Sequence, residues 1–227
     1  MISDVHANLV ALEAVLQKAG AVDIIIHAGD IVDYNPWPLE VLKRIMDLNI
    51  ITVMGNHDRD SATGKPAGYN PYAHISCQWT HTQLTHEYRR YLIELPKKRE
   101  IFIEGLKIFL CHGSPYDLVD EYVFPPPVTS RETLMEFCKF TESDIVIMGH
   151  THIPFVEQFS NKYVINPGSV GQPRDNIAMA SYMILEIYGK NVAINHKRVN
   201  YNIEKVAEKI KNVGLPSFLA QRLFYGI

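Results

Sequence analysis

Imidazole, carboxylate and amide side chains recur in this chain directly after short apolar runs. The run 50–54, for example, leads into Gly55-Asn56-His57-Asp58. Five such runs end in Asp, Asn or His, and the side chains at these ends are Asp4, His6, Asp30, Asn56, His112, His150 and His152. Because polar groups at the carboxyl ends of parallel strands meet at one edge of a sheet, the pattern predicts a single site assembled from strand ends.

The chemistry of these side chains indicates a metal centre. Mixed carboxylate, amide and imidazole ligands suit borderline divalent ions such as manganese, iron, zinc or nickel. One ion does not need seven ligands, whereas two ions about 3.5–4 Å apart that share a carboxylate would use them all. Paired ions of this kind are typical of phosphate-ester hydrolysis. We therefore expect two divalent ions, with manganese as the first candidate, and a small phosphate ester as the substrate.

The sequence between the motifs predicts the elements that position them. Apolar residues fall at helical spacing over 9–20, and a second helix is expected from Pro38. These helices alternate with strand-like runs at 24–27 and 50–54. The order strand, helix, strand, helix, strand predicts a parallel sheet with right-handed crossovers.

The first strand is unusually short. Only Met1 and Ile2 precede Asp4, whereas a strand in the centre of a parallel sheet normally carries a longer apolar run. We therefore expect the natural protein to begin several residues upstream, with an apolar extension.

The alternation of strands and helices stops after Asp58. Residues 59–71 are rich in Gly, Pro, Ala and Asn and predict a loop, and 72–95 predict two short helices. We expect a helical insertion at about 60–95 within one domain that covers 1–227. Short strands separated by turn signals predict an antiparallel second sheet near the end of the chain. Its strands are 154–159, 162–166, 179–188 and 191–199.

Five ordered motifs resemble those of the calcineurin-like metallophosphoesterases. They are Asp4-Val5-His6, Gly29-Asp30, Gly55-Asn56-His57-Asp58, Cys111-His112-Gly113 and Gly149-His150-Thr151-His152. Residues 3–8 and 166–174 look most like the small prokaryotic members. The resemblance implies an α/β fold, a four-layer αββα sandwich of two mixed sheets. It also implies an enzyme that hydrolyses a phosphomonoester or a phosphodiester, nucleotides included.

The resemblance also implies roles for the site residues. One ion would be held by Asp4, His6 and His152, the other by Asn56, His112 and His150, with Asp30 as the bridge. A hydroxide between the two ions would attack phosphorus. His57, oriented by Asp58, would donate a proton to the leaving group.

Two further residues are candidates for contact with the substrate. Asn8 follows the first motif and either touches the substrate or caps the helix that opens at Leu9. Arg174 follows a Gly-rich turn and either clamps a phosphate or forms a surface salt bridge.

Several other readings of the motifs stay open. Serine/threonine protein phosphatases and dinucleoside tetraphosphatases share Gly-Asn-His but normally carry Asp-Arg-Gly where this chain has Asp33-Tyr34-Asn35. A non-catalytic protein-binding scaffold on the same fold, like the retromer subunit, would show a substituted ligand, and none of the seven is substituted here.

Some residues outside the five motifs could also bind ligands. His74, Cys77 and His81 share one possible helical face and could bind zinc. We interpret His27 as structural, and the aromatic residues of 69–91 as core or as a platform for a nucleobase.

Composition excludes several classes of protein. With 47% hydrophobic and 21% charged residues the chain can bury a core. A net charge of -3 without basic blocks gives no strong nucleic-acid signal. No apolar run approaches the roughly 18 residues of a membrane span. The three scattered cysteines predict reduced thiols and a cytoplasmic location. The sequence leaves the oligomeric state open.

Overall fold

The chain alternates strands and helices in its first half and is richer in strands in its second. A computed structural model describes residues 1–227. The elements are α1 (Leu9–Ala19), β1 (Ile26–His27), α2 (Pro38–Asp47), β2 (Ile51–Thr52), α3 (Asn56–Thr63), α4 (Pro71–Gln83), α5 (His86–Glu94), β3 (Lys98–Ile103), β4 (Leu106–Cys111), α6 (Arg131–Phe140), β5 (Ile145–Ile147), β6 (Phe155–Phe159), β7 (Lys162–Asn166), β8 (Ala180–Tyr188), β9 (Asn191–Val199), α7 (Ile203–Asn212) and α8 (Ser217–Gln221). A short 3₁₀ turn, Arg222–Phe224, follows α8.

Five strands form the first sheet, in the order β3-β4-β5-β7-β6. The three central strands run parallel, and the edge strands β3 and β6 are antiparallel to their neighbours. Because side chains alternate across a strand, β4 buries residues on both faces. Ile108 and Leu110 face the core between the sheets, whereas Phe109 and Cys111 join the core with α6.

The second sheet is assembled around the first residues of the chain. Strands β1 and β2 pair in parallel, and β8 and β9 form an antiparallel hairpin. Ile2 pairs with His27 of β1 on one side. On the other side, Met1 and Met183 exchange two backbone hydrogen bonds, of 2.7 and 3.0 Å. The N-terminal residues therefore join the two strand pairs into one mixed sheet.

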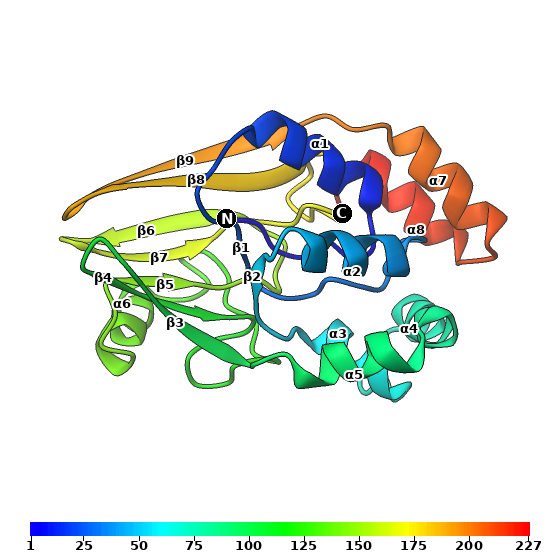
Figure 1. Cartoon of the computed structure of the whole chain (residues 1–227), viewed down its shortest axis with the longest axis horizontal. Helices are drawn as coiled ribbons and strands as arrows, with labels where there is room; N and C mark the ends of the chain where they lie inside the picture. Colours follow the sequence, from blue (N-terminus) through cyan, green and yellow to red (C-terminus); the bar gives the residue numbers. More distant parts are fainter.

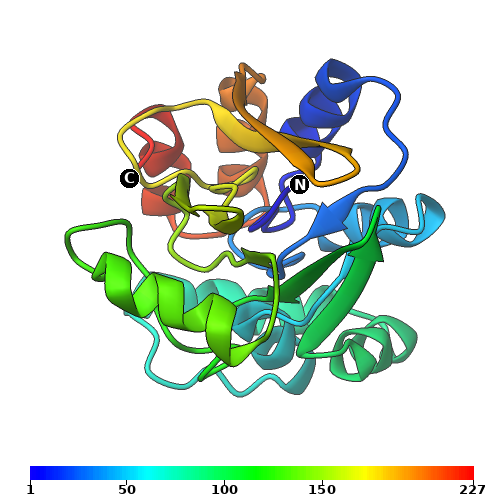
Figure 2. The same cartoon turned by 90° about the vertical axis from the view of Figure 1, so that its left-hand side faces the viewer.

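The two sheets pack face to face, with helices on both outer sides. Helix α1 packs on β8 and β9, and α6 packs on β5, β6 and β7. Figures 1 and 2 show α1 and α6 on opposite sides of the paired sheets. Separate apolar clusters fill the space below α1 and α2, between the sheets, and below α6. The predicted four-layer αββα sandwich is confirmed.

The predicted membership of the second sheet is wrong. Strands β6 and β7 do not join β8 and β9, because β7 pairs in parallel with β5 and the β6–β7 hairpin completes the first sheet. Turn signals identify a hairpin, but they do not specify the sheet edge to which it adds.

The predicted loop over 59–71 is also only partly correct. Helix α3 already begins at Asn56 and runs to Thr63, where Gly64 ends it with a left-handed φ of 68°. Helices α4 and α5 match the two short helices expected over 72–95, and both contact α3.

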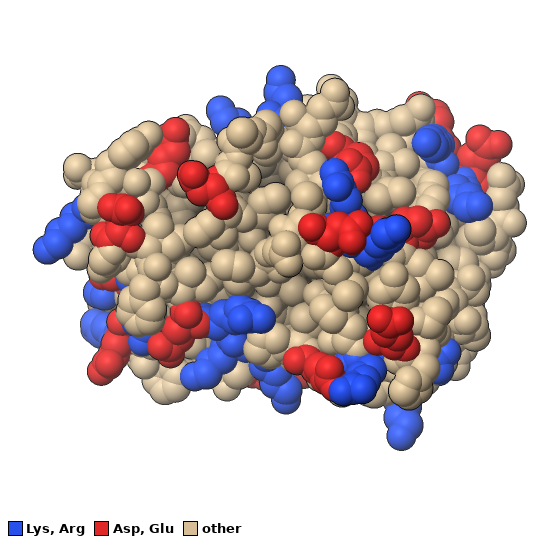
Figure 3. Space-filling model, viewed as in Figure 1, with Lys and Arg blue, Asp and Glu red and all other residues tan.

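Two further features of the structure are the lengths of its helices and the distribution of charge on its surface. No helix combines the length and apolar character needed to cross a bilayer. On the face seen in Figure 3, basic and acidic side chains are interspersed rather than gathered by sign.

Candidate metal centre

Side chains from both sheets meet where their strands end. The second sheet delivers Asp4 and His6 after its N-terminal segment, Asp30 after β1 and Asn56 after β2. The first sheet delivers the remaining three, after β4 and β5, and these are His112, His150 and His152. The structure therefore brings all seven predicted side chains together.

The ligand atoms fall into two groups that share one carboxylate. Within each group the atoms lie within 4.8 Å of one another. The first group contains Asp4, His6, Asp30 and His152, and the second contains Asp30, His112 and His150. Asn56 adds its Oδ1 to the second group, 3.1 Å from Nε2 of His112. Two adjacent centres with one shared ligand are what a pair of ions requires.

Asp30 occupies the shared position. Its Oδ2 lies 3.5 Å from Nε2 of His6 and 3.2 Å from Nε2 of His112. This buried oxygen has no hydrogen-bond partner in the protein. An unpartnered buried carboxylate oxygen is costly unless something charged satisfies it, so the site fits a pair of cations on either side of Asp30.

The imidazoles are oriented by hydrogen bonds on their far sides. Nε2 of His6 and of His152 lie 3.0 Å apart, and Nε2 of His112 lies 3.1 Å from Nδ1 of His150. In each ring the other nitrogen donates to a backbone carbonyl. His6 donates to Val32, His152 to Gln172, His112 to Ala28 and His150 to Asp120. Such bonds fix the tautomer that turns a lone pair toward a metal.

Several site residues have an unusual backbone conformation. Five of the seven candidate ligands have a positive φ in the left-handed region that side chains normally avoid. They are Asp4 (51°), His6 (46°), Asp30 (61°), His150 (70°) and His152 (62°). Strain of this kind persists only where the surroundings impose it, and it clusters at functional sites.

One motif glycine is required by close packing. A Cβ at Gly55 would lie 2.0 Å from Oδ1 of Asp30. Any side chain there would therefore displace the shared carboxylate.

Burial and charge set the protonation of the candidate ligands. Burial lowers the pKa of His6, that of His150 to about 3 and that of His152 to about 4. Burial also opposes ionisation of Asp4 and Asp30, but the neighbouring histidines hold both pKa values below the usual range. Neutral imidazoles and ionised carboxylates are the forms that bind metal.

His112 is the exception among the histidines. Burial favours its neutral form, but the negative charge of Asp30, whose Oδ2 lies 3.2 Å from Nε2 of His112, outweighs burial and raises the pKa of His112 to about 9. The imidazole therefore carries a proton while the centre lacks cations, and metal binding has to release it.

His57 lies beside the metal ligands, and its partner differs from the predicted one. Its Nδ1 donates to Oδ2 of Asp33 over 2.6 Å. The other carboxylate oxygen of Asp33 accepts from the hydroxyl of Ser76 and from the N–H of Tyr34. Although burial opposes it, the carboxylates of Asp30 and Asp33 raise the pKa of His57. Asp33 thus holds the ring with a proton on Nδ1.

The prediction that Asp58 orients His57 is wrong. Asp58 is the third residue of α3, and its side chain folds back to accept the N–H of Gly55 over 3.0 Å. It also accepts the N–H groups of Asp30 and Ile31, over 2.9 and 2.8 Å. Asp58 therefore holds two motif loops together and does not contact the His57 ring.

Replacement of Asp58 by Asn should reduce stability rather than selectively remove a catalytic group. Hydrogen bonds to a charged acceptor are worth about 1.5–3 kcal/mol each, and an amide cannot accept all of them. We expect the free energy of unfolding to fall by about 2–4 kcal/mol in urea denaturation. Asp120→Asn is the matched control, because the exposed Asp120 carboxylate pairs only with Arg59, so its replacement should leave the free energy of unfolding near that of the parent. Equal stability of Asp58→Asn and the parent would contradict this role.

Asn8 caps a helix and is not free to contact substrate. Its Oδ1 accepts the N–H of Ala11 over 3.1 Å, and its Nδ2 donates to the carbonyl of Gly171 over 3.0 Å. Asn8 is fully buried. Because both ends of the amide are used within the protein, the predicted substrate contact is corrected to a structural role.

Arg174 borders the centre without an acidic partner. Its Nη2 donates to Oε1 of Gln172 over 3.0 Å, and the guanidinium lies 5.8 Å from the centre of the Tyr34 ring. The adjacent carboxylate of Asp175 pairs with Arg198 instead. The alternative of a surface salt bridge for Arg174 is therefore wrong, and its charge remains available to an anion.

Three tyrosines surround the histidines. Tyr34 and Tyr122 were not predicted as site residues, whereas Tyr69 belongs to the aromatic residues of 69–91 that the sequence left open as core or as a platform for a nucleobase. Tyr34 and Tyr69 each lie 4.6 Å from the His57 ring, centre to centre, and Tyr122 stacks on His150 at 3.7 Å. The hydroxyl of Tyr69 also accepts from Nδ2 of Asn56 over 2.9 Å, which leaves the amide oxygen facing His112. All three lie in segments without strand or helix periodicity, so spacing gave no signal for them.

Other candidate clusters do not converge. Nδ1 of His27 bonds to the hydroxyl of Thr52, away from the seven ligands. Cys77 contacts the hydroxyl of Ser61, and Nδ1 of His81 bonds to the Ser61 carbonyl. The ligand atoms of His74, Cys77 and His81 do not converge into a group that could hold an ion. Trp79 of α4 and Tyr88 and Tyr91 of α5 pack against apolar clusters, whereas the exposed Tyr72 stacks on Phe218.

Comparison with known proteins gives consistent results. A family model described as the calcineurin-like phosphoesterase superfamily domain matches residues 1–212. The protein MJ0912 of Methanocaldococcus jannaschii is 38% identical over 245 aligned residues, covering 100% of this chain and 97% of that protein. A metallophosphoesterase crystal structure from Sphaerobacter thermophilus has a TM-score of 0.84 at 36% identity, with coverage of 100% and 97%. Phosphodiesterase YfcE of Escherichia coli is 27% identical, with coverage of 81% and 84%.

Proposed function

The chain belongs to the calcineurin-like phosphoesterase superfamily, and we propose that it hydrolyses a small phosphodiester or phosphomonoester with the help of two divalent ions. The observation that carries the proposal is the unpartnered oxygen of Asp30 between two sets of ligands. The family and the relatives named as phosphoesterases make the chain a metal-dependent phosphoric ester hydrolase. A phosphodiester is the first substrate class to test, because YfcE is named a phosphodiesterase.

We assign the two ions to the two groups of ligands. One would be held by Asp4, His6 and His152, the other by Asn56, His112 and His150, and Asp30 would contact both. Divalent ions there would lower the pKa of bound water toward neutrality and offset the charge of the phosphoryl oxygens. Manganese is the first candidate, because mixed nitrogen and oxygen ligands suit it.

His57 is the proposed general acid. With Nδ1 held by Asp33, the remaining ring nitrogen, Nε2, makes no hydrogen bond within the protein. A protonated Nε2 can donate to the oxygen of the departing alcohol as the P–O bond breaks, which prevents release of a high-energy alkoxide. Asp33 then stabilises the correct tautomer.

Arg174 is the proposed contact for the phosphate of the substrate. Its charge reaches the centre: burial and then the charge of Arg174 lower the pKa of His152, and the same charge partly opposes the raised pKa of His57. A second guanidinium, that of Arg222, lies nearby, and burial followed by the charge of Arg174 lowers its pKa to about 10. Arg174 has no carboxylate partner, and the neighbouring charge of Arg222 adds to the positive potential that attracts an anion to this side of the centre.

Arg174→Ala should weaken substrate binding more than turnover. We expect KM to rise about 10- to 100-fold, because a charge-assisted contact to phosphate is worth about 1.5–3 kcal/mol. Steady-state kinetics over a range of substrate concentrations would measure the change. Arg198→Ala is the control, because that side chain pairs with Asp175 instead. An unchanged KM in Arg174→Ala would remove this residue from the substrate site.

One set of assays tests the proposed function. Bis-p-nitrophenyl phosphate, p-nitrophenyl phosphate and a nucleotide panel are each incubated with manganese, nickel, magnesium or EDTA. We expect hydrolysis with at least one metal and none with EDTA. Turnover that survives EDTA would exclude metal-dependent catalysis, and inactivity on every substrate with every metal would contradict hydrolysis of a small phosphate ester.

Other readings of the same fold are less well supported. Protein phosphatases and dinucleoside tetraphosphatases normally carry Asp-Arg-Gly, whereas this chain has Asp33-Tyr34-Asn35. Asp33 bonds to His57 here, but the Arg and Gly of those enzymes are missing. A protein-binding scaffold does not need a complete set of seven ligands with oriented imidazoles. Both observations favour a small-molecule phosphoesterase.

A further inference from the structure

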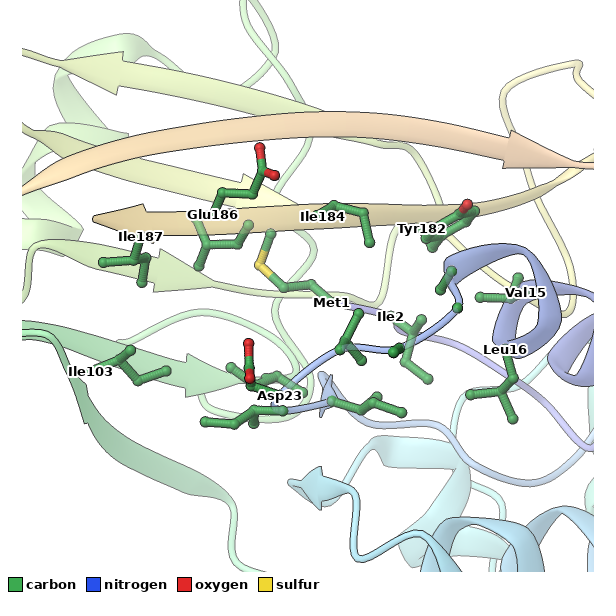
Figure 4. A pocket seen from close by; sticks show the side chains of 18 of the residues that line it. Met1, Ile2, Val15, Leu16, Asp23, Ile103, Tyr182, Ile184, Glu186 and Ile187 are labelled. Carbon is green, nitrogen blue, oxygen red and sulfur yellow. The ribbon is translucent and has the colours of Figure 1, made fainter. Parts of the chain in front are cut away.

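An apolar cavity lies apart from the metal centre. The cavity shown in Figure 4 lies between β8 and residues 23–26 and has a volume of about 570 Å³. Of its 20 lining residues 16 are hydrophobic, and none is a candidate metal ligand. The cavity offers no donor to the centre, so the side chains that tune the centre have to be its direct neighbours.

Tyr69 contacts two functional groups of the centre at the same time. It lies in the loop between α3 and α4, directly before Asn70, whose side chain caps α4. Its hydroxyl accepts a hydrogen bond from Nδ2 of Asn56 over 2.9 Å. Its ring stacks on the His57 ring, with 4.6 Å between the ring centres and 30° between the planes. A candidate metal ligand and the proposed proton donor therefore share one neighbour.

The hydroxyl of Tyr69 sets the direction of the Asn56 amide. Asn56 is 4% exposed, and the Tyr69 hydroxyl is the only protein partner of its Nδ2. With Nδ2 used in this way, Oδ1 points to the second group of ligands, 3.1 Å from Nε2 of His112. An ion can be bound only through the amide oxygen, because the NH2 group is a donor. The hydroxyl therefore keeps Asn56 in the orientation that binds metal.

The ring of Tyr69 restricts His57 from one side. Tyr34 contacts the same imidazole, also with 4.6 Å between the ring centres, and Asp33 binds its Nδ1. A flat contact with an aromatic ring limits rotation of the imidazole, and the π electrons stabilise a positive charge on it. A general acid needs both a protonated ring and a fixed direction for its proton.

Helix α4 and the loop before it provide these contacts together. On α4, the hydroxyl of Ser76 donates to Oδ1 of Asp33, the carboxylate that holds His57. Tyr69 lies just before this helix and contacts His57 directly. One short segment thus orients the proton donor through Ser76 and Tyr69, and a metal ligand through Tyr69.

We propose that Tyr69 is a positioning residue that links the second group of metal ligands to the proton donor. Its hydroxyl turns the Asn56 oxygen toward the ion of that group, and its ring holds the His57 imidazole in place. This role rests on the proposed function, since it needs the two ions and the acid assigned there. Because the hydroxyl contacts Asn56 and the ring contacts His57, the two effects should be separable.

Tyr69→Phe tests the hydroxyl through metal binding alone. The variant keeps the ring but leaves Nδ2 of Asn56 without a partner, and calorimetric titration of the metal-free protein with manganese measures both affinities. We expect the Kd of one ion to rise about 10- to 100-fold, as is usual when a ligand loses the group that orients it, and the Kd of the other to stay near the parent value. Tyr72→Phe is the matched control, because this exposed tyrosine stacks on Phe218, and it should leave both Kd values unchanged.

Tyr69→Leu tests the ring through kinetics. With saturating manganese, its kcat for an alkyl phosphate ester should lie about 3- to 10-fold below that of Tyr69→Phe. For p-nitrophenyl phosphate the two variants should be nearly equal, because this leaving group needs little protonation. Equal additional losses on both esters would overturn the role of the ring.

The manganese titration decides the role of the hydroxyl. Unchanged affinities in Tyr69→Phe, or an equal weakening of both ions, would overturn it. A parent that binds two manganese ions but hydrolyses none of the assayed esters would contradict the proposed function, while the titration would still decide whether Tyr69 positions Asn56.

Discussion

Asp30→Asn is expected to lower kcat by about 10³-fold or more and to reduce the bound metal from two ions to fewer per chain. Oδ2 of Asp30 lies between the ligands of both groups, at 3.5 Å from His6 and 3.2 Å from His112. An amide at this position brings no negative charge. Charge matters here because a shared carboxylate reduces the repulsion between two cations only a few ångströms apart.

The substitution is well suited to isolating that charge. Oδ1 of Asp30 accepts the N–H of His57 over 2.9 Å, and the oxygen of an asparagine can keep this bond. The fold should therefore survive, with a thermal midpoint in the absence of metal close to that of the parent. Metal content by mass spectrometry and kcat with saturating manganese are the two measurements.

A matched control removes an acidic group nearby that ligates nothing. Asp120 pairs with Arg59 through its side chain, while its backbone carbonyl accepts from Nε2 of His150. Asp120→Asn keeps the carbonyl and loses only the surface charge, so both metal content and kcat should stay near the parent values. Two tightly bound ions in Asp30→Asn would show that the carboxylate is not shared.

The sequence predicted the candidate ligands well because each metal-binding side chain follows a recognisable strand. Each of the seven candidate ligands follows an apolar run, and strand ends have few other reasons to carry His, Asn and Asp in succession. Convergence could be expected because strand ends collect at one edge of a sheet. The spacing did not reveal that these ends belong to two different sheets, because that depends on how the hairpin β6–β7 and the hairpin β8–β9 each find an edge.

The directions of the site side chains could not be predicted from the sequence. Asp58 stands next to His57 in the chain, so it was the natural candidate for its partner. On a helix, however, the side chains of neighbouring residues point about 100° apart. The Asp58 side chain therefore points back to the N-terminus of α3, while the His57 ring points toward Asp33. Asp33 has a left-handed φ of 79°, and no pattern in the sequence predicts this backbone conformation.

His57→Asn is expected to lower kcat about 10²–10⁴-fold for substrates with alkyl leaving groups, while the metal content stays unchanged. An asparagine keeps a polar side chain but has no acidic proton to donate. For p-nitrophenyl esters the loss should be much smaller, because p-nitrophenolate is a stable anion and needs little protonation. The ratio of the two losses, measured on one enzyme preparation, reports the proton transfer itself rather than damage to the site.

Asp33→Asn distinguishes the proton donor from the residue that orients it. An amide can still accept from Nδ1 of His57, but without the negative charge that stabilises the protonated ring, so we expect a loss of about 10- to 100-fold with the same dependence on the leaving group. Because Asp33 acts through His57, the double variant should be no slower than His57→Asn alone. Additive losses would mean that the two residues act separately. Equal losses for alkyl and p-nitrophenyl esters in His57→Asn would assign His57 to positioning instead of acid catalysis.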